Sequence, residues 1–261
     1  MRRRQVLTAC STALTALAGC GSRPADTAGS PTPDGPASTT GPLDVQLDAL
    51  QPAVLQLFVD AYEFGGSDGS QYLFLRGPDA TGPDRRVRFD GTEYTPGVET
   101  SYDMVRAPST FGDPTEASDW TVFELPETGD ASDAALVAPG GEWRPDESLR
   151  TRLSATLPSL RVTAFETSPV TAGDRPTFSA TVENTGDTEG RFVGILRAPE
   201  ASLLTGQLVS RAVPAGASVT LEATGGAVET PTPGTGGADG DTLTYELSWP
   251  GGSETASLTV E

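Results

Sequence analysis

The residues of this chain best suited to nucleophilic chemistry are a serine in a glycine-rich turn and two cysteines. Gly65-Gly66-Ser67-Asp68-Gly69 has the G-x-S-x-G spacing of a nucleophile elbow, which needs a strand-to-helix turn and a histidine base. The chain has no histidine, and Gln71–Gly77 predicts another strand after the turn. The pattern therefore predicts an ordinary turn and not a catalytic serine.

The missing residue types also restrict metal and cofactor chemistry. Without histidine or a free thiol, ordinary zinc, copper and haem ligation is excluded. Without lysine, neither a Schiff base nor a Walker-type phosphate site can form. We therefore predict no enzyme activity, no cofactor and no metal site.

Carboxylates remain as a source of chemistry, because the chain has 36 acidic residues. Paired acids hydrolyse glycosides, but no spacing here singles out a pair. Turn aspartates offer oxygen ligands to calcium, although no complete calcium-loop pattern surrounds them. These are Asp68, Asp90, Asp239 and Asp241. A solvated acidic surface is the simpler interpretation.

The thiol of Cys20 stands in a context that favours covalent modification. Small residues before it let a peptidase approach the backbone, and the thiol is the strong nucleophile nearby. Leu17-Ala18-Gly19-Cys20 resembles a lipobox, in which a lipid alkylates the cysteine and a peptidase cuts before it. The resemblance implies a signal peptide over residues 1–19 and a membrane anchor at Cys20. The alternative is an ordinary secretory signal with a chance cysteine.

The residues before the lipobox have the layout of an export signal. A basic head precedes the uncharged run Gln5–Gly19. This run is shorter and more polar than the stretch of about 20 apolar residues that a spanning helix needs. Arg3 and Arg4, followed by Val6 and Leu7, resemble a twin-arginine signal, which implies export in the folded state.

The composition indicates an acidic surface. The formal net charge is −19, and all 17 basic residues are arginines. Such a charge repels nucleic acid, so we predict no nucleic-acid partner. Acidic excess without lysine resembles proteins of halophilic archaea, whose carboxylates stay hydrated while concentrated salt screens their repulsion. A GC-rich genome also exchanges lysine for arginine, so the missing lysine alone does not decide the point.

Two segments follow the proposed anchor. Residues 20–42 are rich in Pro, Gly, Ser and Thr without apolar periodicity, which predicts a lipid-anchored disordered linker. Residues 43–158 alternate strand-like runs with turns, which predicts an antiparallel β module. Within it, Ala53–Phe64 and Gln71–Gly77 predict a hairpin, and Asp90-Gly91 predicts a tight turn.

The β module is expected to end in its one helix, over Arg144–Pro158. Leucines four residues apart mark one face of this helix, and they are Leu149, Leu153 and Leu157. Pro145 suits the first helical position, and Asp146 and Glu147 suit the first turn. Pro158 is expected to end the helix.

Residues 159–261 contain seven short strand-like segments separated by turns. This pattern predicts a seven-stranded immunoglobulin-like sandwich, so that the chain as a whole is mainly all-β. Alternating apolar residues, such as Phe178, Ala180 and Val182, predict the buried face. Asp241 and Tyr245 resemble a tyrosine corner.

One motif in this segment carries a family resemblance. Val182–Phe192, with the sequence VENTGDTEGRF, resembles the CARDB-type adhesion-related domains of archaeal and bacterial surface proteins. The whole chain, with its QYLFLR and LSWPGG segments, resembles lipoproteins of haloarchaea. The resemblance implies a fold and a location but no activity. Gly225–Asp241 departs from it as a low-complexity insertion.

These expectations combine into one functional hypothesis. The chain is expected to be a lipid-anchored, non-enzymatic interaction or adhesion module on the extracellular side of a halophilic cell membrane. Its expected partners are the membrane, through the lipid on Cys20, and an envelope protein or polysaccharide. The alternative is a lipoprotein that captures a sugar or calcium for a membrane complex. The tryptophans Trp120, Trp143 and Trp249 are the candidates for stacking on a sugar.

Overall fold

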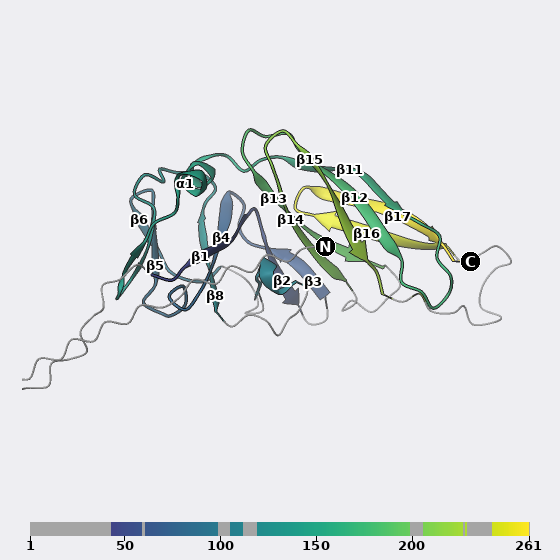
Figure 1. The fold of residues 1–261 in the computed structure, drawn as a ribbon, viewed down its shortest axis with the longest axis horizontal. Coiled ribbons are helices and arrows are strands. Elements are labelled where there is room, and N and C mark those ends of the chain that lie inside the picture. Colours follow the sequence, from purple (N-terminus) through teal and green to yellow (C-terminus); the bar gives the residue numbers. More distant parts are fainter. Residues whose placement is uncertain are drawn as a thin grey trace, which may run out of the picture. The chain divides into compact units, whose positions relative to one another are not determined.

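The computed structural model describes residues 43–58, 61–98, 105–111, 119–198, 206–226, 228 and 242–260. All of them belong to one compact unit, Thr39–Glu261. The described residues form seventeen strands, one α-helix and one short 3-10 helix, η1 (Pro108–Thr110) (Figure 1). The strands pair antiparallel in five sheets, so the expected all-β class is confirmed.

Two sheets and the helix enclose the first apolar core. The first sheet has the strand order β1-β4-β8 and the second has the order β10-β9-β5-β6. Their bounds are β1 (Gln46–Gln51), β4 (Ser70–Arg76), β8 (Trp120–Pro126), β10 (Gly141–Trp143), β9 (Ala135–Ala138), β5 (Arg86–Phe89) and β6 (Thr92–Tyr94). The core between them includes Leu75, Phe89, Phe123 and Leu136, each fully buried.

The predicted hairpin between Ala53–Phe64 and Gln71–Gly77 is wrong. The first segment is itself a hairpin of β2 (Val54–Phe58) and β3 (Ala61–Gly65), and β7 (Val105–Arg106) pairs with β2. The second segment is β4, which pairs with β1 and β8 instead. Five consecutive residues of β4 are buried, because β4 is a central strand with both faces covered.

The tight turn predicted at Asp90-Gly91 is confirmed. Asp90 and Gly91 join β5 to β6, and both have positive φ, 50° and 68°. Two successive positive φ angles define the type I′ turn that matches the twist of a two-residue hairpin. Gly91 suits the second position because it has no Cβ to oppose this conformation.

The predicted helix is present but shorter, as α1 (Glu147–Ser154). Leu149 and Leu153 are buried in the first core, as expected, whereas Leu157 lies beyond the helix. Asp146 is the N-cap and not part of the first turn, because its Oδ1 accepts the N–H of Leu149 at 2.8 Å. Pro145 therefore precedes the cap, and its predicted place at the first helical position is wrong.

The C-terminal end of α1 is capped by a residue from β4. Gln71, on β4, donates from Nε2 to the carbonyl oxygen of Leu153 at 3.0 Å. This bond satisfies one of the carbonyls that the last helical turn leaves free. Ala155 then takes extended backbone angles, so the chain leaves the helix three residues before Pro158.

The C-terminal strands form the predicted sandwich of seven strands. One sheet has the order β11-β12-β15 and the other has the order β14-β13-β16-β17. Their bounds are β11 (Leu160–Thr167), β12 (Thr177–Asn184), β13 (Gly190–Arg197), β14 (Gln207–Val213), β15 (Ser218–Thr224), β16 (Thr242–Trp249) and β17 (Gly252–Thr259). In the constant-type immunoglobulin fold the fourth strand joins the four-stranded sheet with the first two strands. Here the fourth strand, β14, pairs with the third.

Apolar alternation places the second core between these two sheets. Phe178, Ala180 and Val182 are buried on β12, as predicted. The ring of Phe178 lies 4.5 Å from that of Tyr245 on β16, and burial raises the pKa of the Tyr245 phenol. Tyr245 is therefore a core residue, while Asp241, its partner in the proposed tyrosine corner, lies outside the described residues.

Asn184, in the VENTG motif, is the polar centre of the β12–β13 connection. Its side chain is 1% exposed. Its Nδ2 donates to the carbonyl oxygens of Thr188 at 2.8 Å and Val213 at 2.9 Å. Its Oδ1 accepts the N–H of Gly186 at 2.9 Å. One side chain thus fixes the turn and joins it to the end of β14.

We predict that Asn184→Ala lowers the free energy of unfolding by about 2–3 kcal/mol, because it leaves buried backbone groups without partners. Denaturant unfolding followed by circular dichroism measures the loss. Thr185→Ala, at the exposed neighbouring position, is the matched control and should change stability by less than about 0.5 kcal/mol. Equal effects of the two substitutions would contradict the assigned role of Asn184.

Candidate functional site

The residues predicted to carry the anchor, Arg3, Arg4 and Cys20, lie outside the described residues, as do Asp239 and Asp241. Asp68 and Asp90 are exposed in two different turns. Within the part of the chain that the structure describes, no group of three or more Asp, Glu, Cys or His side chains has an arrangement that could hold a metal. None of the helices described there is long and apolar enough for a membrane span.

The three tryptophans do not form a common platform. Each packs, partly buried, against a different apolar cluster: Trp143 on the first core, Trp249 on the second, and Trp120 on a smaller cluster beside Phe74. The ring of Trp249 lies 6.1 Å from that of Phe192. These rings contribute to packing in separate parts of the fold.

The G-x-S-x-G segment joins two strands, as predicted. Ser67 donates its backbone N–H to the hydroxyl of Tyr72 at 2.5 Å, and that hydroxyl donates to Oε1 of Glu124 at 3.3 Å. Burial raises the pKa of the Tyr72 phenol, with a further contribution from the Glu124 charge. The segment therefore folds over a buried tyrosine and lacks the strand-to-helix geometry of a nucleophile elbow.

The most distinctive described region is an apolar contact between the β2–β3 hairpin and the outer face of the β13–β14 pair. We call it the junction cluster. It contains Leu55, Val193, Ile195 and Leu208, with Tyr62, Phe64 and Phe111 packed against it. At its end, Arg197 Nη2 donates to the carbonyl oxygen of Tyr62. The sequence analysis did not predict this cluster, because its residues come from strands that lie far apart in the chain.

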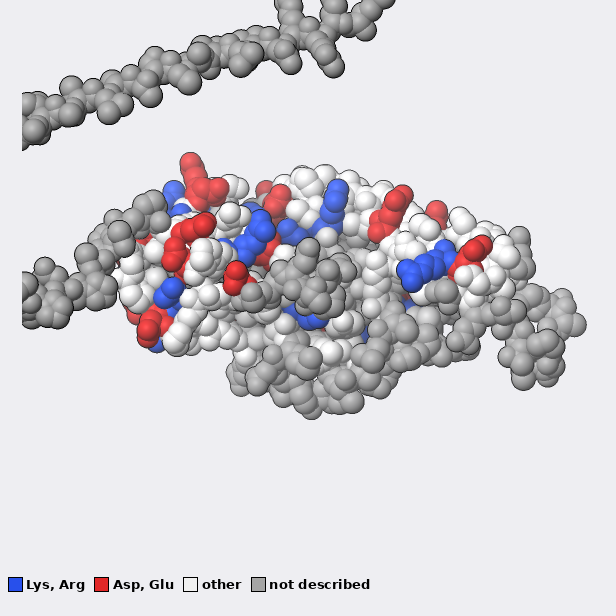
Figure 2. Space-filling view, turned by 60° about the horizontal axis from the view of Figure 1, so that its bottom comes forward, with Lys and Arg blue, Asp and Glu red and all other residues white. Residues whose placement is uncertain are grey.

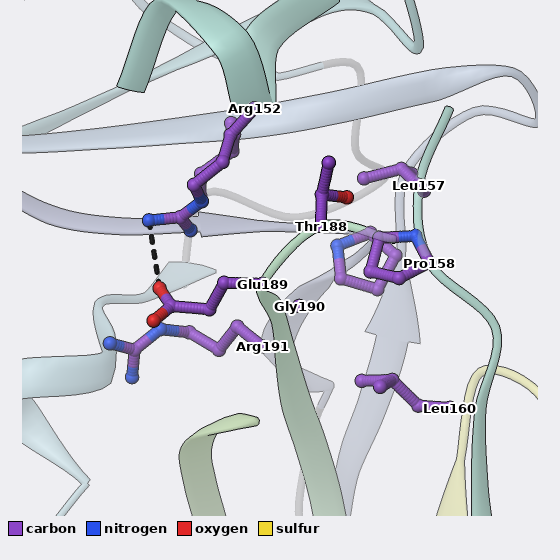
Figure 3. Close-up of a pocket in the computed structure, with 10 residues that line it drawn as sticks. Arg152, Leu157, Pro158, Leu160, Thr188, Glu189, Gly190 and Arg191 are labelled. Atoms are coloured by element: carbon purple, nitrogen blue, oxygen red, sulfur yellow. Dashed lines mark ion pairs between the residues drawn. The ribbon is translucent and has the colours of Figure 1, made fainter. Parts of the chain in front are cut away.

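Next to the junction cluster, α1 and β13 enclose a small cavity, which we call the junction cavity (Figure 3). Arg152, Glu189 and Arg191 lie on one side of it, and Leu157, Pro158 and Leu160 on the other. Leu50, Pro52, Thr188 and Gly190 complete the lining. The volume is about 20 Å³, which is room for one species the size of a water molecule. Pockets for organic ligands are typically about 300–1,000 Å³.

Close packing of Pro158 against glycine shapes this cavity. A Cβ on Gly190 would lie 2.5 Å from Cγ of Pro158, and one on Gly186 would lie 2.8 Å from its Cβ. Real Cβ atoms do not approach so closely. Both glycines of the TGDTEG turn therefore allow the segment between α1 and β11 to lie against β13.

Charged side chains form the other wall. Arg152 Nη1 lies 3.0 Å from Oε1 of Glu189, and the Arg152 side chain is only 15% exposed. Arg191 Nη1 donates to Oγ of Ser210 at 3.0 Å. Burial lowers the pKa of the Arg191 guanidinium, Asp48 and Glu189 oppose this shift, and Arg152 adds to it.

A second feature is an open groove at the side of the sandwich. It lies between β14 and β15, which are edge strands of the two sheets, and has a volume of about 570 Å³. Pro108 and Phe111 contribute to its lining. An edge strand presents unpaired backbone N–H and C=O groups, which can pair with another extended segment.

Comparison with known proteins does not assign a family. No family model matches the chain, and no curated protein matches it. Among solved structures, it is similar to the GH2 beta-galacturonidase from Eisenbergiella tayi at 9% identity and a TM-score of 0.30, over 83% of this chain and 43% of that one.

Two further solved structures are similar at comparable levels. The alkylpurine DNA glycosylase AlkC of Pseudomonas fluorescens matches at 13% identity and a TM-score of 0.29, over 41% of this chain and 31% of that one. The beta-glucuronidase 2 of Bacteroides uniformis matches at 10% identity and a TM-score of 0.21, over 75% of this chain and 26% of that one. The chain spans less than half the length of each of these three proteins, and likenesses of this size carry no functional argument.

We predict that Leu55→Ala, in the junction cluster, lowers the free energy of unfolding by about 2–5 kcal/mol, because Leu55 is fully buried and its removal leaves a cavity. Thermal and denaturant unfolding measure the loss. Leu57→Ala removes the same atoms from the same strand at a half-buried position. It should lower the free energy of unfolding by less than half as much as Leu55→Ala does. Similar losses at both positions would show that burial of Leu55 in the junction cluster adds no stability beyond that of a half-buried leucine on the same strand.

Proposed function

We propose that this protein is a lipid-anchored, non-enzymatic interaction module on the extracellular side of the cell membrane. The observation that carries the proposal is the sequence Leu17-Ala18-Gly19-Cys20, placed after Arg3-Arg4 and a weakly apolar run. Removal of residues 1–19 would leave Cys20 as the first residue, with a lipid on its sulfur. The linker over residues 21–42 would then separate the folded part from the membrane by about 25 Å as a flexible coil.

The described β-sheets support an interaction role through two features. The junction cluster joins the β2–β3 hairpin to the sandwich, so that both belong to one packed surface. The groove between β14 and β15 borders two sheet edges, where an extended segment of an envelope protein can add by backbone pairing. We propose this groove as the contact surface.

The composition of the chain supports a location in concentrated salt. Acidic and basic side chains are interspersed on the described surface (Figure 2), and arginines pair with carboxylates at several places, such as Arg161 with Glu183 at 2.7 Å. Exposed pairs of this kind contribute little to stability. The excess of acidic residues in the whole chain therefore carries the halophilic proposal.

The anchor predicts a change of cell fraction. Cys20→Ser should move the protein from the membrane fraction to the soluble fraction or the medium, because it removes the only thiol in the lipobox. Fractionation with immunoblotting measures the distribution, and mass spectrometry of the native protein should find a lipid at the N-terminal cysteine. Cys10→Ser, a control in the signal segment, should leave the distribution unchanged. A membrane-bound Cys20→Ser variant would refute the lipid anchor.

The contact surface predicts position-dependent cross-linking. A photo-reactive amino acid in place of Arg211, exposed on β14, should cross-link to an envelope protein in intact cells, whereas one in place of Thr255, exposed on β17, should not. Equal yields at both positions would exclude the groove. A sharp calorimetric isotherm with calcium or a glycan would favour the ligand-capturing alternative.

A further inference from the structure

The hydrogen bonds at the end of β15 show which of its backbone groups face the groove. The N–H of Gly225 donates to the carbonyl oxygen of Pro176, which precedes β12, at 2.8 Å. Thr224 donates its N–H in the other direction, to Oε1 of Gln207 on β14, also at 2.8 Å. Backbone groups of successive residues in an antiparallel strand point to opposite sides. Every second residue of β15, counted back from Thr224, therefore points away from β12.

Three positions of this edge are open to another strand. β15 pairs only with β12 among the described strands. The backbone groups of Ser218, Thr220 and Glu222 point away from β12 and have no hydrogen-bond partner among the described residues. Thr224 differs, because the side chain of Gln207 already accepts its N–H. Thr220 and Glu222 also line the groove.

β15 lacks the devices that usually protect an exposed edge strand. Its pairing with β12 runs over seven residues without a register shift, and it contains no proline. β11, the other edge strand of the same sheet, has a register shift between Val162 and Ala164, and β17 lies against it. A regular edge without bulges is a template for another extended strand.

The open positions match a second copy of themselves, because Thr220 lies at their centre. In an antiparallel pair with a two-fold axis at Thr220, each Thr220 lies opposite its equivalent, and Ser218 lies opposite Glu222. Each open N–H then meets an open carbonyl oxygen. Thr224, which Gln207 already occupies, lies outside the pairing. Two-fold contacts between identical surfaces are the commonest kind in homo-oligomers.

The side chains are also compatible in this register. On the outer face, Thr220 meets Thr220 and Glu222 meets the hydroxyl of Ser218, so like charges are not directly opposed. On the core-facing side, Val219 lies opposite Leu221, and both are apolar residues of the second core. The two Glu222 residues lie four residue steps apart, roughly 13 Å. This distance exceeds the screening length of about 8 Å at physiological ionic strength.

We propose that the extended segment that adds to the groove is β15 of a second copy of this chain. Two three-stranded sheets then join into one continuous sheet across a two-fold axis at Thr220. This inference rests on the groove as the proposed contact surface and names its partner. Copies anchored in the same membrane meet at a high effective concentration, which favours the pairing.

Cysteine cross-linking tests the register. The full chain with Cys10→Ser and Cys20→Ser has no native thiol. In this background, Thr220→Cys should form a disulfide-linked dimer on mild oxidation, because residues directly opposite in such a pair have Cα atoms about 5.5 Å apart. Ser218→Cys and Glu222→Cys should each stay unlinked alone and should cross-link when mixed.

Sedimentation velocity in concentrated sodium chloride tests the dimer itself. The cysteine-free chain should sediment as a reversible dimer. Thr220→Pro should weaken dimerisation at least about tenfold, because it removes two backbone hydrogen bonds at the axis. Its circular dichroism should not change, since this N–H has no partner in its own sheet. Thr220→Lys, which places like charges opposite each other, should weaken the dimer as well.

Thr255, exposed on β17, provides the matched controls. Thr255→Cys should stay unlinked, and Thr255→Lys should dimerise as the parent chain does. Equal disulfide yields from Thr220→Cys and Thr255→Cys would overturn the proposed pairing.

The same measurements separate the partner from the surface. A chain that stays monomeric, while a photo-reactive residue at Arg211 cross-links to a different envelope protein, would overturn the second copy and leave the groove as the contact surface. A dimer with the expected cysteine pattern, without a cross-link from Arg211 in cells, would support the β15 pairing and contradict only the proposed role of the groove in the envelope.

Discussion

The junction cluster, which includes Leu55 on β2 and Ile195 on β13, is the constraint on which the rest of this structure depends. Both residues are fully buried, although a sandwich strand normally buries only the face that points to the core. The β2–β3 hairpin covers the outer face of β13, so five consecutive residues of β13 are buried. This strand is therefore central to the fold, with sheets packed on both sides of it.

The ends of β13 carry the polar features of the junction. Arg191, near its start, lies at the junction cavity, and Arg197, at its end, donates to Tyr62. The turn before the strand is held by Asn184, which also reaches β14. Because Gly190 leaves room for Pro158, the segment from α1 passes close to the same strand. One strand thus organises the hydrophobic contact, the ion pair and the cavity.

A protein held at a membrane by a flexible linker benefits from this kind of coupling. In the proposed anchored form the linker would provide reach, whereas the packed β-sheets would present any contact surface as one body. With Cys10 in the signal and Cys20 modified, the proposed mature chain has no pair of cysteines for a disulfide. Its stability would then rest on apolar packing and on buried polar centres such as Asn184.

The sequence by itself determined the features that depend on neighbouring residues. Alternation along β12, the Asp90-Gly91 turn and the buried leucines of α1 follow from local periodicity and backbone preference. The tertiary structure alone decided which strands pair, because β4 finds β1 and β8 through contacts far apart in the chain. It also decided that Arg152, Glu189 and Arg191 meet, since a spacing of 37 residues between Arg152 and Glu189 gives no local signal. Local pattern specifies an element, and only the packing of distant elements specifies its partner.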